Sequence, residues 1–430
     1  MKNIISMLGI LLLVFVAGCS VNPVTGKNEL ALMNVSVEQE IQLGGRSFAQ
    51  AIQKMGGEYP DRTLAGYVNR VGQKLARTSH RPELQYHFKV VNDSSPNAFA
   101  LPGGYIAITR GLLTSMENEA QMAAVLAHEI GHVTARHSIQ ELQRSSLVGT
   151  TIGLLGTLAG GTGYGQLLTQ VGGLTANLLS KSYSRDQEYE ADGLSVDYLV
   201  QAGYSVQGAV QLQNIFIKKF ENGNNADWLN NMFRTHPFSR DRLAAIEHRI
   251  ATRYPAKRNT YGLDSAFYEN NMGSLKQTLN AYELYDRAQE AEGKGQLDAA
   301  IGLYHKAMQN APDHGLLLTA LGMAYLRKED MVPARRYLLK AVNSDPDYFK
   351  SRMGLGYIYL ENKQAAQAAQ QLETSIKLLP TVEGTYLLAE AEEMQQHLPR
   401  ARQLYQTVVQ ADKDGKLGQS AAARLRSLSR

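Results

Sequence analysis

The chain has 430 residues, and its 44 lysines and arginines against 40 aspartates and glutamates give a formal net charge of +4. This length exceeds one ordinary hydrophobic core, so we expect two or more domains. The basic residues are spread along the chain and form no block that could follow a phosphate backbone, which excludes nucleic acid as an expected partner.

Residues 1–19 are predicted to be an export signal, because one lysine precedes an apolar run and then small residues before Cys19. Cys19 is the only cysteine, and Val16-Ala17-Gly18 before it resembles the lipobox of bacterial lipoproteins. The resemblance implies that Cys19 is lipidated, and Ser20 resembles a signal for outer-membrane sorting. We therefore expect a lipid-anchored chain on the periplasmic side of a bacterial envelope, at the outer membrane. The alternative is an ordinary cleaved signal.

Residues 20–254 are expected to form the first domain, in which helices and short strands follow one another. Apolar periodicity predicts a helix over 62–78, strands within 84–91 and 104–109, a long helix from about Asn118 to Arg144, and a helix over 184–199. Asn118 and Gln121 are spaced as a capping box at the start of the long helix.

The long helix carries the sequence His128-Glu129-Ile130-Gly131-His132. Two histidines four residues apart project from one face of a helix, where both imidazoles can reach one Zn²⁺ ion. Glu129 is placed to take a proton from a water on that ion, as in the H-E-x-x-H pattern of zinc peptidases. His137 should point elsewhere, and we expect it at the surface.

A third metal ligand must come from another segment, because a catalytic zinc usually has three protein ligands. The helix over 184–199 offers Glu188 and Asp192 on one face, whereas Glu190 is turned away from Glu188. Spacing permits Glu188 as the ligand and Asp192 as the acceptor that orients a zinc-bound imidazole. The alternative is that these acids only solvate a helix.

Residues 145–180 contain no charged residue and include nine glycines. The polar stretch 160–166 divides the segment into pieces too short to span a bilayer. We expect an apolar helix-loop-helix packed on the first domain, where it could act as a lid. The alternative is an integral membrane peptidase inserted through this segment.

Residues 281–415 repeat with a period of 34, which is the tetratricopeptide period. The repeated positions are Ala300, Ala334 and Ala368, then Pro312, Pro346 and Pro380, then Ala288, Gly322 and Gly356, and the pair Tyr325 and Tyr359. Small residues where helices cross and a proline closing each unit are typical of stacked helical hairpins. We expect a solenoid that binds proteins, joined to the first domain by a connector at 255–280 and followed by a tail at 416–430.

These motifs together resemble the zinc peptidases of the HtpX and CAAX-prenyl-endopeptidase family, over roughly residues 30–250. In that family the third ligand is the glutamate four residues before the aspartate, which implies Glu188. The segment 234–242 resembles the family's later Thr-His-Pro segment, which implies a catalytic role for His236. His236 would either stabilise the carbonyl oxygen of the substrate or fill the open zinc position as an inhibitory ligand.

The segment 97–113 resembles the family's substrate-side edge strand. A strand at Gly104–Thr109 with a free edge would accept an extended peptide by backbone pairing. Asn97, Phe99, Gly104 and Tyr105 are the expected substrate contacts.

The expected fold is mainly α (α+β), with a zincin-like peptidase domain, a small β-sheet and a C-terminal α-solenoid. The expected function is a zinc endopeptidase that uses zinc-activated water to cleave misfolded or misassembled envelope proteins, with the outer-membrane barrel assembly machinery as a hypothetical partner of the repeats. The alternative is a chaperone or scaffold that acts through its repeats and keeps a latent zinc site.

Overall fold

The computed structural model describes residues 19–30 apart from 23, 25 and 27, and then residues 35–147, 182–221 and 235–428. Residues 1–18 of the signal predicted at 1–19, and all but the first three residues of the uncharged segment 145–180, lie outside the described residues. Within the described part, no helix combines the length and the hydropathy that a membrane crossing requires.

The N-terminal domain, which we define as the described residues up to Gln277, is mostly helical and has a small sheet at its centre. Its long helices are α2 (Val37–Lys54), α3 (Arg62–Ala76), α5 (Glu119–Thr134), α10 (Arg185–Ala202), α11 (Gln207–Glu221) and α13 (Arg240–Arg253). The helix predicted over 62–78 is confirmed as α3, which begins where the Asp61 side chain accepts from the backbone N–H groups of Thr63 and Leu64. Its predicted apolar stripe is buried against the core.

The sheet has three strands in the order β3 (His87–Val91), β5 (Tyr105–Thr109), β4 (Ala98–Leu101). β5 pairs in parallel with β3 and antiparallel with β4. The prediction that the strand at Gly104–Thr109 has a free edge is therefore wrong, since β5 is the central strand. β4 is the edge strand next to α5, and on its outer side the Ala100 carbonyl accepts from the Ser138 hydroxyl at 3.3 Å. The sequence prediction failed here because strand order depends on pairings that local alternation does not reveal.

The single helix predicted from Asn118 to Arg144 is also wrong, because the chain turns at Arg136 and begins a new helix, α6 (His137–Leu147). Arg136 has a left-handed φ of 59°. Its guanidinium contacts the Glu40 carboxylate at 2.5 Å and the carbonyl oxygen of Val35 at 2.7 Å. A two-stranded hairpin of β1 (Cys19–Val21) and β2 (Asn28–Leu30) lies at the same corner, where Asn22 donates to the carbonyl of Ala135.

The connector predicted at 255–280 is folded against the N-terminal domain. It contains η2 (Pro255–Lys257), α14 (Ser265–Asn271) and α15 (Gly273–Gln277). Tyr268 is fully buried, and its hydroxyl donates to the carbonyl of Leu113 at the end of the short helix α4 (Arg110–Leu113). The connector therefore completes the core of the first domain.

The repeats predicted from the 34-residue period form helical hairpins. Their helices are α16 (Leu279–Gly293), α17 (Leu297–Asn310), α18 (Gly315–Arg327), α19 (Met331–Ser344), α20 (Phe349–Glu361), α21 (Ala365–Leu378), α22 (Val382–Met394) and α23 (Leu398–Ala411). A Cβ at Gly322 would lie 2.7 Å from Leu338, and one at Gly356 would lie 2.5 Å from Leu372. The repeated glycines therefore let the paired helices touch.

The C-terminal tail predicted at 416–430 is instead a helix, α24 (Lys416–Leu428). Its Ala421 is fully buried, and Leu417 and Leu425 pack against the last apolar cluster of the repeats. A terminal repeat has an open apolar face, so a closing helix is what the solenoid requires there.

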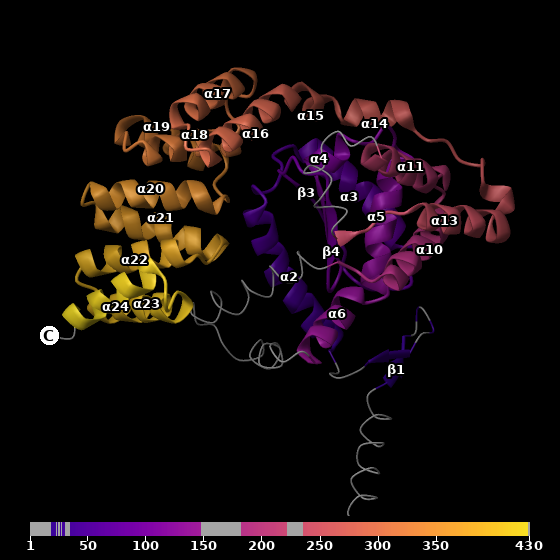
Figure 1. Ribbon diagram of the computed structural model, residues 1–430, viewed down its shortest axis with the longest axis horizontal. Helices are drawn as coiled ribbons and strands as arrows, with labels where there is room; N and C mark the ends of the chain where they lie inside the picture. The colour runs from indigo at the N-terminus through magenta and orange to yellow at the C-terminus, as the bar shows by residue number, and fades with distance from the viewer. Residues whose placement is uncertain are drawn as a thin grey trace, which may run out of the picture.

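The repeats curve from α16 beside the N-terminal domain to α24 at the C-terminus, and α2 lies between the sheet and the repeats (Figure 1). At the junction the Gln53 side chain donates to the carbonyl of Asp347 at 2.6 Å and accepts from the backbone N–H of Phe349 at 2.9 Å. The Arg110 guanidinium lies 3.5 Å from the centroid of the Tyr282 ring. Side chains as well as the backbone therefore join the two parts. The predicted fold class, mainly α with a small sheet and a helical solenoid, is confirmed.

Candidate metal centre

Helix α5 holds the two histidines of the H-E-x-x-H pattern in a buried position. Every residue of α5 except His128 is buried. The helix begins where the Asn118 side chain accepts from the backbone N–H of Gln121 at 3.0 Å. The Gln121 side chain accepts from the backbone N–H of Glu117 rather than from that of Asn118, so the predicted capping box is shifted by one residue. This cap fixes where the helix starts and hence which face carries the histidines.

Helix α10 brings Glu188 to the histidines. Its own N-terminus is a capping box between Ser184 and Gln187. Gly131, between the two histidines, allows the close approach of α10, because a Cβ there would lie 3.1 Å from the Ala191 backbone. The glycine in the H-E-x-x-H pattern of this chain therefore has a packing role.

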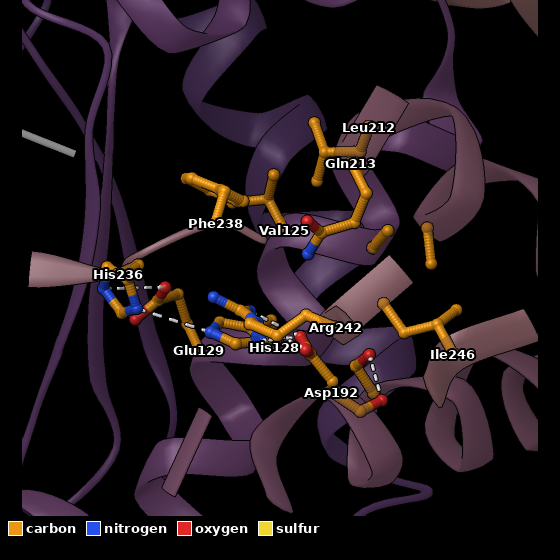
Figure 2. A pocket seen from close by; sticks show the side chains of 13 residues that line it. Val125, His128, Glu129, Asp192, Leu212, Gln213, His236, Phe238, Arg242 and Ile246 are labelled. Atoms are coloured by element: carbon orange, nitrogen blue, oxygen red, sulfur yellow. Dashed lines mark hydrogen bonds and ion pairs between the residues drawn. The ribbon is translucent and has the colours of Figure 1, made fainter. Parts of the chain in front are cut away.

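Four side chains from three segments converge on one point. One donor atom from each of His128, His132, Glu188 and His236 lies within 4.8 Å of the others. His132 Nε2 is 3.0 Å from His128 Nε2 and 3.5 Å from Glu188 Oε1. Figure 2 shows His128, Glu129 and His236 side by side at the edge of a pocket. Buried imidazole and carboxylate groups that point at one another suit a divalent metal ion, which would satisfy all of them at once.

His236 enters this cluster from the chain just before α13. Its Nδ1 is 3.0 Å from Glu188 Oε1 and 3.4 Å from His128 Nε2. Its Nε2 is 3.7 Å from Glu129 Oε1. The ring therefore lies among the candidate metal ligands His128, His132 and Glu188.

Glu129 lies next to the cluster with one oxygen unused. Its side chain is almost fully buried, and Oε2 has no hydrogen-bond partner among the described residues. Burial raises the pKa of Glu129 above its usual value. A buried carboxylate with a free oxygen is suited to exchange a proton with a nearby water.

Asp192 lies behind His128, where the sequence predicted it. Its Oδ1 is 3.0 Å from His128 Nδ1. Arg242, which the sequence reasoning missed, holds both oxygens of Asp192 at 2.7 Å and reaches Glu188 Oε2 at 2.5 Å. Burial alone would raise the pKa of Asp192, but the Arg242 guanidinium lowers that pKa below its usual value. The one available signal was that Arg242 stands six residues after His236 in the same segment.

The prediction that His137 is a surface residue is wrong. His137 is fully buried, and its Nδ1 is 2.8 Å from His132 Nδ1. Its Nε2 is 3.0 Å from Glu190 Oε2, so Glu190, although turned away from Glu188, also belongs to the surroundings of the site. The turn at Arg136 returns the ring to α5, which a continuous helix would not do.

The four predicted substrate contacts are not all at a free edge. The carbonyl of Gly104 accepts from the backbone N–H of His87, and Tyr105 lies in the central strand, stacked on the His87 ring. Asn97 comes directly before the edge strand β4, and Phe99 lies within it, but the Phe99 side chain is buried. The backbone pairing predicted at Gly104 and Tyr105 is therefore not available.

A small cavity of about 30 Å³ adjoins His128 and Glu129. Figure 2 shows Val125, Leu212, Phe238 and Ile246 around it, so its walls are largely apolar. The carbonyl oxygen of the Gln213 side chain has no hydrogen-bond partner among the described residues. The cavity places an apolar wall directly beside the candidate catalytic groups.

Comparison with known proteins gives two family matches. Peptidase family M48 matches residues 63–250, and the tetratricopeptide repeat matches 285–349, 334–382 and 353–416. The beta-barrel assembly-enhancing protease of Yersinia pestis is 25% identical over 393 residues, which are 83% of this chain and 78% of that protein. The protease of the same name from Escherichia coli (strain K12) is 28% identical over 226 residues, or 50% of this chain and 44% of that protein. The match therefore spans less than half the length of the E. coli relative. Metalloprotease YcaL of the same strain is 32% identical over 215 residues, covering 47% of this chain and 80% of that protein.

Proposed function

Because this chain belongs to peptidase family M48, as its motifs predicted, and is a metalloendopeptidase, we propose that it is a zinc enzyme that cleaves misassembled envelope proteins. The observation that carries the proposal is the convergence of His128, His132 and Glu188 within 4.8 Å of one another. Two imidazoles and one carboxylate are the protein ligands of a well-known class of catalytic zinc sites.

Zinc bound at this centre would supply a Lewis acid that polarises the peptide carbonyl and lowers the pKa of water to about 7. Glu129 would take the proton of the attacking water on its unpaired Oε2 and deliver it to the departing amine. Asp192 would orient His128 through the contact at its Nδ1. Arg242 would in turn hold Asp192 in place.

For His236 we propose the inhibitory role of the two that the sequence left open. Its Nδ1 lies 3.0 Å from Glu188 Oε1, which places the ring where a fourth ligand would bind. In this position His236 would hold the metal together with His128, His132 and Glu188 and would exclude a water from it. Catalysis would then require His236 to move away from the position of the metal.

For the substrate we propose an extended polypeptide that pairs with β4. The carbonyl of Asn97 accepts from the backbone N–H of Thr109. Because the backbone groups of an antiparallel strand face alternate sides, those of Asn97 and Phe99 both face β5. The backbone groups of Ala98 and Ala100 therefore face the outer edge, where a substrate would have to replace the Ser138 hydroxyl that donates to the Ala100 carbonyl at 3.3 Å. Pairing through the backbone depends little on side-chain identity, which suits an enzyme that acts on unfolded chains.

For the location we propose the periplasmic side of the outer membrane, with a lipid on Cys19 as the anchor. The relatives from Yersinia pestis and Escherichia coli are named for enhancing beta-barrel assembly. By analogy the repeats of this chain would bind a component of the outer-membrane barrel assembly machinery, and misassembled outer-membrane proteins would be the substrates. Replacing Cys19 behind a cleavable signal should release the chain from membranes.

The test is Glu129→Gln in the full mature chain, with zinc content measured beside casein cleavage. We expect the variant to bind one zinc per chain and to lose cleavage, because only the proton acceptor is removed. Loss of envelope function in the same variant would support the peptidase. Survival of envelope function would support the alternative, a scaffold that acts through its repeats.

A further inference from the structure

Behind His132, on the side away from the metal ligands, lie two polar residues that the proposed reaction does not use. His132 Nδ1 is 2.8 Å from His137 Nδ1, and His137 Nε2 is 3.0 Å from Glu190 Oε2. The side chains of His132 and His137 are fully buried, and that of Glu190 is 12% exposed. The three side chains form one continuous chain of hydrogen bonds with little access for bulk water.

The donors and acceptors in this series of hydrogen bonds can be assigned in only one way if His132 binds a metal. Two ring nitrogens at 2.8 Å can bond only if one carries a proton and the other a lone pair. His132 Nε2 faces the ligand cluster and must present a lone pair to bind a metal, so His132 Nδ1 carries the proton. His137 Nδ1 then accepts, and His137 Nε2 donates its proton to the Glu190 carboxylate. With these tautomers each of the two hydrogen bonds has one donor and one acceptor.

The corner between α5 and α6 explains how His137 reaches His132. Five residues apart on a continuous helix, the two rings would lie on different faces. The left-handed φ of Arg136 breaks the helix, and the contacts of Arg136 with Glu40 and Val35 fix the turn. The corner is thus held by α2, and it presents the His137 ring to His132.

The second histidine of the metal centre is supported in another way. His128 Nδ1 faces the Asp192 carboxylate directly at 3.0 Å. For His132 an imidazole stands between the ring and its carboxylate. In both histidines the proton is therefore held on Nδ1. His128 donates it directly to a carboxylate, whereas His132 donates it to His137, which in turn donates to Glu190; we call His137 and Glu190 the relay.

We propose that His137 and Glu190 are positioning residues that hold His132 in the tautomer whose Nε2 lone pair faces the metal. Neither residue touches the substrate or the metal. The inference rests on the proposed zinc centre. It predicts that the relay sets zinc affinity, because outer hydrogen-bond partners of a ligating histidine typically change metal affinity by about 10- to 100-fold.

The experiment measures zinc affinity of the full mature chain by competition with a chromophoric chelator. His137→Phe and Glu190→Ala should each weaken zinc binding by about 10- to 100-fold. The double variant should be no weaker than the worse single variant, because the two residues act as one chain. His137→Gln should restore most of the affinity, since its amide can accept from His132 and donate to Glu190. Asp186→Asn, at an exposed position of the same helix, is the matched control and should bind zinc like the unchanged chain.

Two further measurements distinguish a positioning role of His137 and Glu190 from a role in packing alone. Thermal unfolding of the metal-free variants reports lost packing, and nitrogen NMR of labelled histidines reports which ring nitrogen carries the proton. We expect the proton on Nδ1 of His132 and on Nε2 of His137 in the zinc-loaded chain. Unchanged zinc affinity in Glu190→Ala, or a proton on Nδ1 of His137, would overturn the relay while leaving the zinc centre intact. If the unchanged chain binds no zinc, the proposed function and the relay fail together. Should His137→Phe not fold, Glu190→Ala and the NMR measurement still decide.

Discussion

Arg242 holds Asp192 through two parallel hydrogen bonds of 2.7 Å, one to each carboxylate oxygen. The Arg242 side chain is only 4% exposed, and it also reaches Glu188 at 2.5 Å. One buried cation thus contacts two buried carboxylates, Glu188 of the candidate ligand set and Asp192, which lies 3.0 Å from His128 Nδ1. A planar guanidinium suits this arrangement because its fork matches a carboxylate.

Arg242→Gln should lower the free energy of unfolding of the metal-free chain by about 3–5 kcal/mol, because two carboxylates lose their buried partner. Arg249→Gln is the matched control, since Arg249 lies on the same helix and pairs with Asp197 of the same neighbouring helix. Asp197 keeps a hydrogen bond from Tyr254 when Arg249 is removed. Urea unfolding should therefore show a much smaller loss for Arg249→Gln, and equal losses would contradict a special role for Arg242.

His236→Ala should increase casein cleavage if His236 occupies the fourth metal position in the resting enzyme. The gain would be about tenfold for each 1.4 kcal/mol by which the unchanged chain favours the arrangement with His236 at the metal over the arrangement with His236 moved away. Zinc affinity should fall at the same time, because one ligand is lost. Steady-state cleavage and chelator competition on the same preparation check both effects. A drop in cleavage with unchanged zinc affinity would instead indicate that His236 stabilises the carbonyl oxygen.

Gly322→Ala should destabilise the repeats by about 1–3 kcal/mol, because the added Cβ would lie 2.7 Å from Leu338 and force the paired helices apart. Gly302→Ala is the control, since no atom lies within 4 Å of a Cβ at that helical position. This second change should stabilise helix α17 by up to about 1 kcal/mol. Thermal unfolding of the two variants should therefore shift in opposite directions.

Asp286 links the first repeat to the N-terminal domain by accepting from the Ser94 hydroxyl at 2.7 Å. Burial raises the pKa of Asp286 above its usual value. In the folded chain the charged form is therefore disfavoured, and the unchanged chain loses stability as pH rises through that raised pKa. Asp286→Asn should be more stable than the unchanged chain at neutral pH, and the difference should vanish below about pH 4, where the unfolded carboxyl is protonated. Urea unfolding across this pH range tests the sign.

The residues of the candidate metal centre could be singled out because helical periodicity places His128 and His132 on one face of a helix, and Glu188 with Asp192 on one face of another helix. Spacing only permitted Glu188 as a ligand, and the family resemblance implied that role. The repeats could be predicted because small residues recur every 34 positions, at the points where two paired helices touch. His137 could not, because its position depends on a turn at Arg136 that α2 stabilises through Glu40, far away in the sequence. The strand order could not either, since β5 pairs not only with its neighbour β4 but also, in parallel, with β3, and local alternation does not reveal that second pairing. For Arg242 the one signal was its position six residues after His236, which does not identify the side chains that it contacts.

Ala98→Pro tests whether β4 is the edge that accepts the substrate. Proline lacks a backbone N–H, and at Ala98 that group faces away from β5, so the sheet keeps its internal pairing. Proline is tolerated on edge strands for this reason, so the variant should fold. Its KM for an unfolded protein substrate should rise, while the rate for a very short peptide that cannot pair with the strand should change little. Ala107→Pro in the central strand should unfold the sheet and serves as the contrast. An unchanged KM in a folded Ala98→Pro chain would place the substrate elsewhere.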